Sequence, residues 1–322
     1  MSNSQERNYD WIEYENGIEL GKKGHCISKC ANSFPTHILH QFHVIFLQLF
    51  LDKVKVDSWW RFLLHCSYCL CLCDAPGPES DRYWSLLPQV SDLENNKIVV
   101  GVRFVKRNRI IHLEIQQATA LPEGNVDEDS MEWIEAPILD VTNKTQQDSG
   151  LFKELSYEER ALDLDKLSAS TGSVITGIRF RQLGGHINLE IRSTPIRFHT
   201  GELIKQRSIW IGNDNTPATP EMRTKLEIPS PDVPTNQPQS SSMISDKNQY
   251  LLFDATSPFK DVRQTTIPYI DSQIVTPKKS SWLSGIGIYY KGFIGYGGYV
   301  GAMVSTYDSS KHLVPKRFDK NA

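Results

Sequence analysis

Two stretches of this 322-residue chain share one pattern: Val99–Ile115 reads VVGVRFVKRNRIIHLEI, and Ile175–Ile191 reads ITGIRFRQLGGHINLEI. They align without a gap at an offset of 76 residues, and seven of the 17 aligned positions are identical. Such a repeat indicates that one structural unit occurs twice in the chain. Each copy has two alternating apolar segments around a short polar loop, which predicts a β-hairpin.

The alternation predicts which side chains each hairpin buries. In the second strand of the first copy, Ile111 and Leu113 share one face, and His112 and Glu114 share the other. In the first strand, Phe104 belongs to the apolar face. We expect the apolar faces to form the core.

An arginine and a glutamate occur on the polar face of both copies, Arg103 with Glu114 and Arg179 with Glu190. With loops at residues 106–109 and 182–185, each pair would lie diagonally across its hairpin. A solvated cross-strand ion pair stabilises a protein by about 0.2–1 kcal/mol. Because the pair recurs in both copies, we interpret it as holding the hairpin register and not as a catalytic site.

A third, weaker copy is predicted at Leu283–Tyr290, LSGIGIYY, where Gly285, Ile286 and Ile288 match the first two. Three such units predict a mainly β, repeat-built fold of the β-prism type with pseudo-threefold symmetry, each apolar face turned toward a shared interior. A β-sandwich or a trefoil is the alternative.

Composition divides the chain into four parts. They are a short, partly helical, Cys-rich N-terminal segment (1–78), two β units (79–215), a Pro/Ser-rich linker or loop (216–249) and a Gly/Tyr-rich third unit (250–318). The linker holds six of the 17 prolines, and such a composition buries too little apolar surface to order itself.

The start of the chain is polar and acidic, and no signal peptide is visible in it. The most apolar run, residues 38–51, is shorter than the roughly 20 residues of a membrane span, so we expect a buried helix and no membrane span. The net charge of −3 gives no reason to expect nucleic acid as a partner.

All six cysteines lie within the first 73 residues: Cys26, Cys30, Cys66, Cys69, Cys71 and Cys73. They are candidates for three disulfides, for which 15 connectivities exist. A zinc site completed by His25 or His65, or free buried thiols, are the alternatives. We favour disulfides and expect no metal, because the spacing lacks the knuckles of common zinc ribbons.

Seven of the 20 glycines fall within residues 285–301, interleaved with tyrosines. This pattern does not match a nucleotide-binding loop. Tyr296, Gly297, Gly298 and Tyr299 are candidate ligand-binding residues, because an aromatic surface with close backbone could stack on sugar rings. In the alternative, the glycines permit tight turns across which the tyrosines pack.

The sequence contains no common catalytic motif and predicts no cofactor. The acidic run 123–135 is interpreted as a solvated loop that returns Trp133 to the core. One N-linked glycosylation sequon occurs, Asn143-Lys144-Thr145, and it would be used only in a secreted chain.

Several stretches, among them CSYCLCLCDAPGPESDRYW, VITGIRFRQLGGHINLEIR and GIGIYYKGFIGYGG, resemble an arthropod family of secreted proteins with a domain of unknown function. The resemblance covers roughly residues 59–318. It implies an extracellular location and disulfides at Cys66, Cys69, Cys71 and Cys73. It implies no known activity.

Together these observations predict a non-catalytic extracellular protein that binds a ligand or builds a structure, with a lectin-like role as one form of binding and a glycan or an extracellular protein as partner. A component of extracellular matrix, cuticle or eggshell is one alternative, and an uncharacterised hydrolase is another. The sequence leaves the oligomeric state open.

Overall fold

The computed structural model divides into two compact units, Met1–Gly77 and Pro78–Ala322. In the N-terminal unit it describes the backbone of residues 11–14, 19–21, 53–61 and 64–71. In the C-terminal unit it describes residues 82–156, 159–214, 223–228, 241–255, 266–293 and 295–312.

The described part of the N-terminal unit is one antiparallel sheet with strand order β2-β1-β4-β3. Its strands are β1 (Trp11–Tyr14), β2 (Glu19–Gly21), β3 (Lys53–Arg61) and β4 (Leu64–Cys71). Cys66, Cys69 and Cys71 lie on β4. The other three cysteines and the apolar run predicted to be helical lie outside the described residues.

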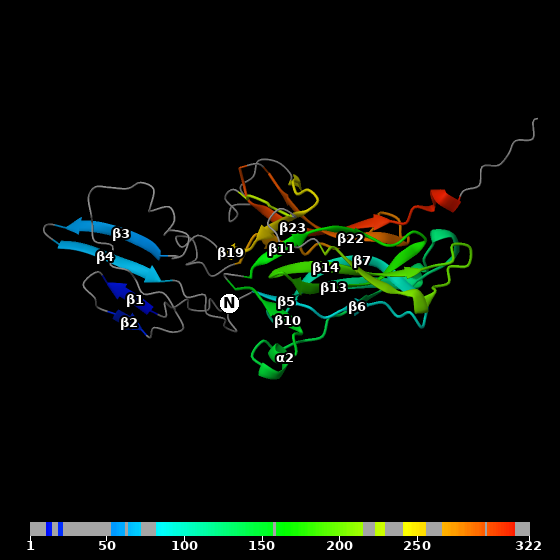
Figure 1. Cartoon of the computed structure of the whole chain (residues 1–322), viewed down its shortest axis with the longest axis horizontal. Helices are drawn as coiled ribbons and strands as arrows, with labels where there is room; N and C mark the ends of the chain where they lie inside the picture. Colours follow the sequence, from blue (N-terminus) through cyan, green and yellow to red (C-terminus); the bar gives the residue numbers. More distant parts are fainter. Residues whose placement is uncertain are drawn as a thin grey trace, which may run out of the picture. The chain divides into compact units, whose positions relative to one another are not determined.

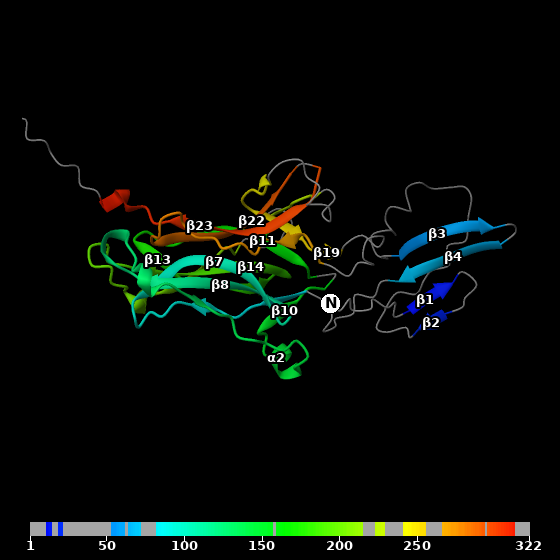
Figure 2. The same ribbon diagram turned by 180° about the vertical axis from the view of Figure 1, so that it is seen from behind.

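The C-terminal unit is mainly β, as predicted, and has three larger sheets, none closed into a barrel. The first sheet has the order β10-β5-β8-β7, with β9 on β8. The second has the order β16-β18-β11-β14-β13-β6, with β15 on β14. The third has the order β12-β22-β23-β21, with β17 on β22. Figures 1 and 2 show the long strands of all three running along the length of this unit.

The first sheet contains β5 (Tyr83–Ser85), β7 (Lys97–Arg107), β8 (Ile110–Thr119), β9 (Glu132–Ile134) and β10 (Phe152–Glu154). The second contains β6 (Gln89–Val90), β11 (Ala161–Leu164), β13 (Ser173–Leu183), β14 (His186–Pro195), β15 (Ile209–Gly212), β16 (Thr224–Lys225) and β18 (Gln249–Leu252). The third contains β12 (Lys166–Ser168), β17 (Ser242–Met243), β21 (Tyr269–Ile270), β22 (Leu283–Gly292) and β23 (Gly298–Thr306). A two-stranded ribbon of β19 (Asp254–Ala255) and β20 (Thr266–Ile267), the helix α2 (Lys144–Asp148) and short 3-10 turns at 122–124, 128–130, 205–207 and 309–312 complete the described elements.

Each sheet is built around one long antiparallel hairpin: the first hairpin is β7–β8, the second is β13–β14 and the third is β22–β23. Each has a register shift beside a glycine of the aligned sequence pattern, at Gly101, Gly177 and Gly285. Each also has a short parallel strand against its second strand, namely β5, β11 and β21.

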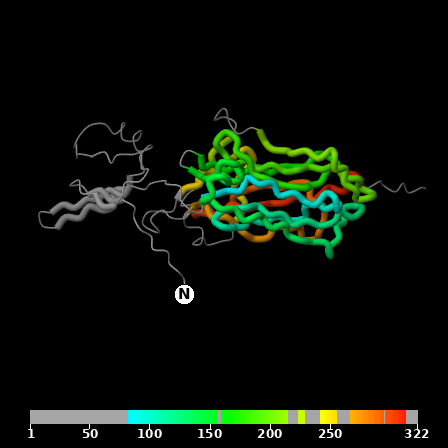
Figure 3. Tube along the Cα trace, turned by 90° about the horizontal axis from the view of Figure 1, so that it is seen from below, coloured from blue at the N-terminus to red at the C-terminus, as the bar shows by residue number. Residues whose placement is uncertain are grey.

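The chain passes from sheet to sheet in a closed order. After β5 in the first sheet, β6 pairs with β13 of the second, and after β11 in the second sheet, β12 pairs with β22 of the third. After β21 in the third sheet, Val275 bridges to Val102 on β7 of the first. Figure 3 shows the cyan and green segments, which are distant in sequence, side by side along the unit.

The three bulge glycines lie where this neighbouring chain crosses. A Cβ on Gly177 would come within 2.9 Å of the Gln89 carbonyl oxygen, and one on Gly285 within 2.7 Å of the Leu167 carbonyl oxygen. Any larger residue would push the crossing segment away, so the glycine at the start of the GIRF and GIGI segments has a packing cause.

The main core is shared by all three sheets, and it includes the predicted apolar faces of the hairpins. Phe104 of the first sheet stacks on Phe180 of the second at 6.4 Å between ring centroids, and Trp84 meets both rings edge-on. Ile286 and Ile288 of the third sheet are buried in the same cluster. Burial of each such side chain contributes about 1.5–3 kcal/mol, so the sheets depend on one another for stability.

The hairpin turns are shorter than predicted. β7 ends at Arg107 and β8 begins at Ile110, so only Asn108 and Arg109 form the turn, both with positive φ (45° and 69°). Gly184 and Gly185 form the equivalent turn at 57° and 80°. Two residues with positive φ are typical of the type I′ turn, whose twist matches that of the strands.

Parts of the Pro/Ser-rich segment are built into the sheets. β16 pairs with β18 at the edge of the second sheet, and β17 pairs with β22 in the third. Residues 215–222 and 229–240 lie outside the described part.

Candidate functional site

The outer face of the first hairpin holds a buried carboxylate. The Glu114 side chain is 0% exposed and lies directly opposite Arg103. Its Oε2 accepts hydrogen bonds from Arg103 Nε (3.0 Å) and Nη2 (2.8 Å), and its Oε1 accepts from Arg107 Nε (2.7 Å) and the Ala136 amide (2.9 Å). Burial alone would raise the pKa of Glu114, but these hydrogen bonds outweigh it and hold that pKa below its usual value.

The second hairpin repeats this arrangement with different partners. Glu190 lies opposite Arg179, which donates to its Oε2, and Arg181 Nη1 lies 3.0 Å from its Oε1. Our prediction that the two Arg–Glu pairs are diagonal and solvated was wrong. The two-residue turns bring each pair into direct register, and the chain beyond each hairpin covers the glutamates.

A tryptophan covers the arginine in both hairpins. The Arg103 guanidinium carbon lies 4.2 Å from the Trp133 ring centroid, and that of Arg179 lies 4.4 Å from the Trp210 centroid. The two tryptophans occupy the same position beside the second strand, on β9 and on β15. Trp133 was predicted to return to the core, but it is half-buried on the outer face, because β9 adds to the edge of β8.

We call these two sets, Arg103–Glu114–Trp133 and Arg179–Glu190–Trp210, the Arg–Glu–Trp stacks. Sequence reasoning found the Arg and the Glu but missed the Trp. The two tryptophans could have been found by aligning the segments that follow each hairpin, because both segments contain a Trp-Ile pair. Trp133-Ile134 and Trp210-Ile211 pair with equivalent residues of β8 and β14.

The third hairpin has no such stack. At the register of the Arg–Glu pair it carries Gly287 opposite Met303. A Cβ at Gly287 would come within 2.7 Å of the Asp165 carbonyl oxygen, so the crossing strand β12 excludes an arginine there.

The predicted ligand residues lie at the turn of this third hairpin. Tyr296 and Tyr299 are half-buried, whereas Gly297 and Gly298 are buried. The Tyr296 ring lies 5.8 Å from that of Phe293. The Tyr299 ring lies 6.5 Å from that of Tyr269 on the neighbouring strand β21, a pairing that sequence reasoning missed.

The two glycines are required by packing. A Cβ on Gly298 would come within 2.1 Å of the Lys291 carbonyl oxygen and 2.8 Å of the Tyr290 hydroxyl. The alternative prediction, in which the glycines permit tight packing beside tyrosines, therefore accounts for Gly298. The same contact places the Tyr290 hydroxyl against Gly298, within the main core.

Tyr290 is 0% exposed, and its hydroxyl has no hydrogen-bond partner in the part of the chain that the structure describes. Burial raises the pKa of Tyr290, so the hydroxyl keeps its proton. Lys291, next along the strand, forms an ion pair with Asp271 at the side of the turn. We call the four half-buried aromatic residues Tyr269, Phe293, Tyr296 and Tyr299 the Gly–Tyr surface.

A buried ionic cluster lies on the second sheet. Arg223 donates from Nη1 (3.0 Å) and Nη2 (2.8 Å) to the two carboxylate oxygens of Asp165, and its Nε lies 3.5 Å from Asp163. His186 Nδ1 is 2.7 Å from Asp163, and Asn188 Nδ2 is 3.1 Å from it. These side chains hydrogen-bond to one another, and the cluster attaches the segment that contains Arg223 to the sheet.

A small recess between the first two sheets contains His112, which is 1% exposed. Neither of its ring nitrogens, nor the Gln89 Oε1 beside it, has a hydrogen-bond partner among the described residues. Burial lowers the pKa of His112 to about 4; the charge of Glu114 opposes this shift and that of Arg107 adds to it. At neutral pH the ring is therefore uncharged.

Asn143 lies at the start of α2, with an exposed side chain. Over the described ranges, no group of three or more His, Cys, Asp or Glu side chains is placed to share a metal ion. None of the helices described has the length and apolar character that a membrane crossing requires.

The described geometry defines a mainly β protein whose three larger sheets share one core and whose outer faces differ. A family model described as a domain of unknown function (DUF4803) matches residues 50–115, from the start of the β3–β4 hairpin to the middle of β8. No curated protein matches the chain. The arthropod origin of the family and its repeated units stay predictions.

Proposed function

We propose that this chain is a non-catalytic extracellular binding protein of the β-prism type that binds glycans through the Gly–Tyr surface. The observation that carries the proposal is the set of half-buried aromatic rings at the turn of the third hairpin, Tyr269 beside Tyr299 and Phe293 beside Tyr296.

The prism architecture is supported by the pairing of the strands. The three hairpins share the position of a bulge glycine, each has a parallel strand at the same register, and the chain joins the sheets in a closed order. One core lies among them. Three sheets around a common interior are the arrangement that a β-prism requires.

A non-catalytic role is supported by the way the buried acids are used. Glu114 and Glu190 are each held between two arginines, and Asp165 is paired to Arg223 through both oxygens. A general acid or base needs a proton-accepting atom within reach of a substrate. These carboxylates face arginines instead, which weakens the hydrolase alternative.

Glycan binding is supported by the chemistry of the Gly–Tyr surface. Sugar rings present C–H groups that stack on aromatic faces, and their hydroxyls both donate and accept hydrogen bonds. The ion pair of Lys291 with Asp271 offers further polar contacts at the edge.

The extracellular location rests on the resemblance to a family of secreted proteins and on the cysteine-rich N-terminal unit, for which we propose disulfides. Alkylation of thiols followed by mass measurement, with and without reduction, tests this part. Six free thiols in the secreted protein would contradict it.

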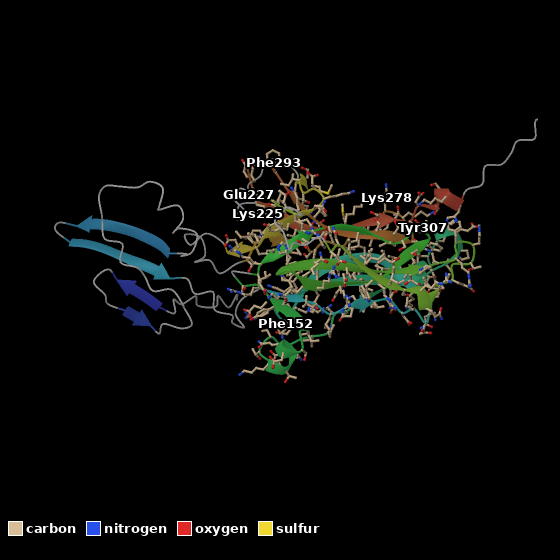
Figure 4. All side chains as sticks on the ribbon, in the orientation of Figure 1. Phe152, Lys225, Glu227, Lys278, Phe293 and Tyr307 are labelled. Carbon is tan, nitrogen blue, oxygen red and sulfur yellow. The ribbon has the colours of Figure 1, made fainter. Side chains whose placement is uncertain are left out.

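The glycan part is tested by screening the purified full chain on a glycan array and measuring the affinity for the best ligand by calorimetry. Tyr296→Ala and Tyr299→Ala should each weaken binding at least tenfold. Tyr307→Ala is the matched control, because Tyr307 is also a half-buried aromatic residue but lies at the opposite end of the unit from Phe293 (Figure 4), and it should bind normally.

A blank array together with a glycan-independent thermal stability would contradict the proposal. If the protein then partitions into an insoluble extracellular fraction, the structural alternative in matrix, cuticle or eggshell replaces it.

A further inference from the structure

The sequon Asn143-Lys144-Thr145 begins the short helix α2, and all three residues are exposed. Figures 1 and 2, which view the molecule from opposite sides, both show α2 projecting from the sheets. A bulky group attached here would meet solvent.

The hydrogen bonds of Asn143 leave its nitrogen available. The side-chain oxygen Oδ1 accepts from the Thr145 amide (3.0 Å) and the Gln146 amide (3.3 Å) and so caps the helix. The side-chain nitrogen Nδ2 makes no hydrogen bond to any residue that the structure describes. Substitution on Nδ2 therefore breaks no contact of the fold.

The loop around the sequon is anchored on both sides. Leu139 and Val141 precede it and Phe152 follows it, and all three are buried in one apolar cluster. Asn108 Nδ2 donates to the Leu139 carbonyl oxygen at 2.6 Å. The loop thus presents Asn143 at a fixed place, whether or not it carries a substituent.

We propose that Asn143 is N-glycosylated. The oligosaccharide is transferred from a lipid-linked pyrophosphate donor: a bond forms between Asn143 Nδ2 and C1 of the first sugar, the bond from C1 to the pyrophosphate oxygen breaks, the amide loses one proton, and the lipid pyrophosphate leaves. This proposal rests on the extracellular part of the proposed function and not on glycan binding. Figure 4 shows Phe152, near the sequon loop, and Phe293, on the Gly–Tyr surface, on opposite sides of the unit, so the attached glycan leaves that surface free.

The test is expression of the full chain behind a heterologous secretion signal in mammalian cells, with intact mass measured before and after treatment with peptide N-glycosidase. We expect the enzyme to remove the mass of one glycan and to leave aspartate at position 143. Thr145→Ala should abolish the modification, and Thr145→Ser should retain it.

Asn143→Asp is the matched control, because aspartate caps a helix as well as asparagine but is not an acceptor. It should be secreted, keep the thermal stability of the deglycosylated protein and lack the glycan. Secreted, folded wild-type protein without a glycan at Asn143 would overturn the proposal, and so would a glycan that persists in Asn143→Asp. The same variant can be screened on the glycan array. Failure of the Gly–Tyr surface to bind sugars is therefore distinguished from failure of Asn143 to be glycosylated.

Discussion

The outer face of the third hairpin carries different residues from the outer faces of the first two at the same register positions. In the first two, a buried glutamate is held by two arginines, one of which is covered by a tryptophan. In the third, Gly287 and Met303 occupy the positions of the Arg–Glu pair, and tyrosines gather at the turn. The inward faces, by contrast, are apolar in all three.

This difference teaches that the inner faces of the three hairpins share an apolar core, whereas their outer faces carry different side chains. On the outer faces of the first two hairpins, the charged groups form buried ion pairs that stabilise the fold. The third has none of these ion pairs at the same register and carries the Gly–Tyr surface instead.

The largest loss of stability is expected when Glu114 of the first hairpin is replaced by methionine, the residue at the same register in the third hairpin. Glu114→Met removes the carboxylate that Arg103, Arg107 and the Ala136 amide share. Loss of one partner of a buried ion pair costs about 3–5 kcal/mol, and we expect the lower end, about 3–4 kcal/mol, because both arginines are partly exposed and can hydrate. Urea denaturation measures the change in the free energy of unfolding.

The reverse exchange is the control. Met303→Glu places a carboxylate on a half-exposed position opposite a glycine, so the free energy of unfolding should change by less than about 1 kcal/mol. Equal losses in the two variants would show that the hairpins do not differ in this way.

The second-largest expected effect on stability is a loss at acidic pH that depends on His112. His112 has a pKa of about 4 in the folded protein against an ordinary value of 6.5, so the unfolded chain binds its proton first. The stability that the neutral ring contributes is complete above pH 6.5 and is lost as the pH falls toward 4. Since one pKa unit corresponds to 1.36 kcal/mol, the loss reaches about 3 kcal/mol. Arg179 also lines the recess, the charge of Arg107 opposes a charged ring, and that of Glu114 favours it.

His112→Asn isolates this contribution, because asparagine occupies the same register in the second hairpin, at Asn188. Unfolding free energies measured from pH 7 to pH 4 should fall less steeply in the variant than in the wild type. Parallel curves would contradict the assignment to His112.

Much of the inner face could be predicted from the sequence. Ile111, Leu113 and Phe104 are buried as expected, because strict alternation over a hairpin is a local signal. The coverage of Glu114 and His112 could not be predicted, since it depends on β9, on the chain near Ala136 and on the crossing segment near Gln89, none of which the hairpin sequence specifies.

The candidate site was predicted only in part. The Gly/Tyr composition named Tyr296 and Tyr299, and the structure places aromatic rings beside both, but the neighbouring ring of Tyr269 was not predicted. Tyr269 joins through β21, a strand of two residues, which is too short to carry a periodic signal.

A third, smaller effect tests the tryptophans of the Arg–Glu–Trp stacks. Trp133→Ala and Trp210→Ala each remove a cation–π contact, which is worth about 0.5–2 kcal/mol in a partly exposed site. Similar losses, near 1–2 kcal/mol by urea denaturation, are expected in both. A loss confined to one variant would show that the two stacks are not equivalent.

The smallest effect on stability is expected at the Gly–Tyr surface. Tyr296→Ala removes a half-buried ring at a turn and should change the free energy of unfolding by less than about 1 kcal/mol. A larger loss, measured in the same urea titration, would assign Tyr296 to the core packing of the hairpin instead of to a ligand surface.

The central claim, that the third outer face binds ligand while the first two stabilise the fold, is tested most directly by calorimetric titration of one array-selected glycan. The Tyr296→Ala/Tyr299→Ala double variant and the Trp133→Ala/Trp210→Ala double variant are compared with the wild type. We predict that binding is lost in the tyrosine variant, which keeps its stability, and is retained in the tryptophan variant, which is less stable. Loss of binding in the tryptophan variant with retention in the tyrosine variant would contradict the account.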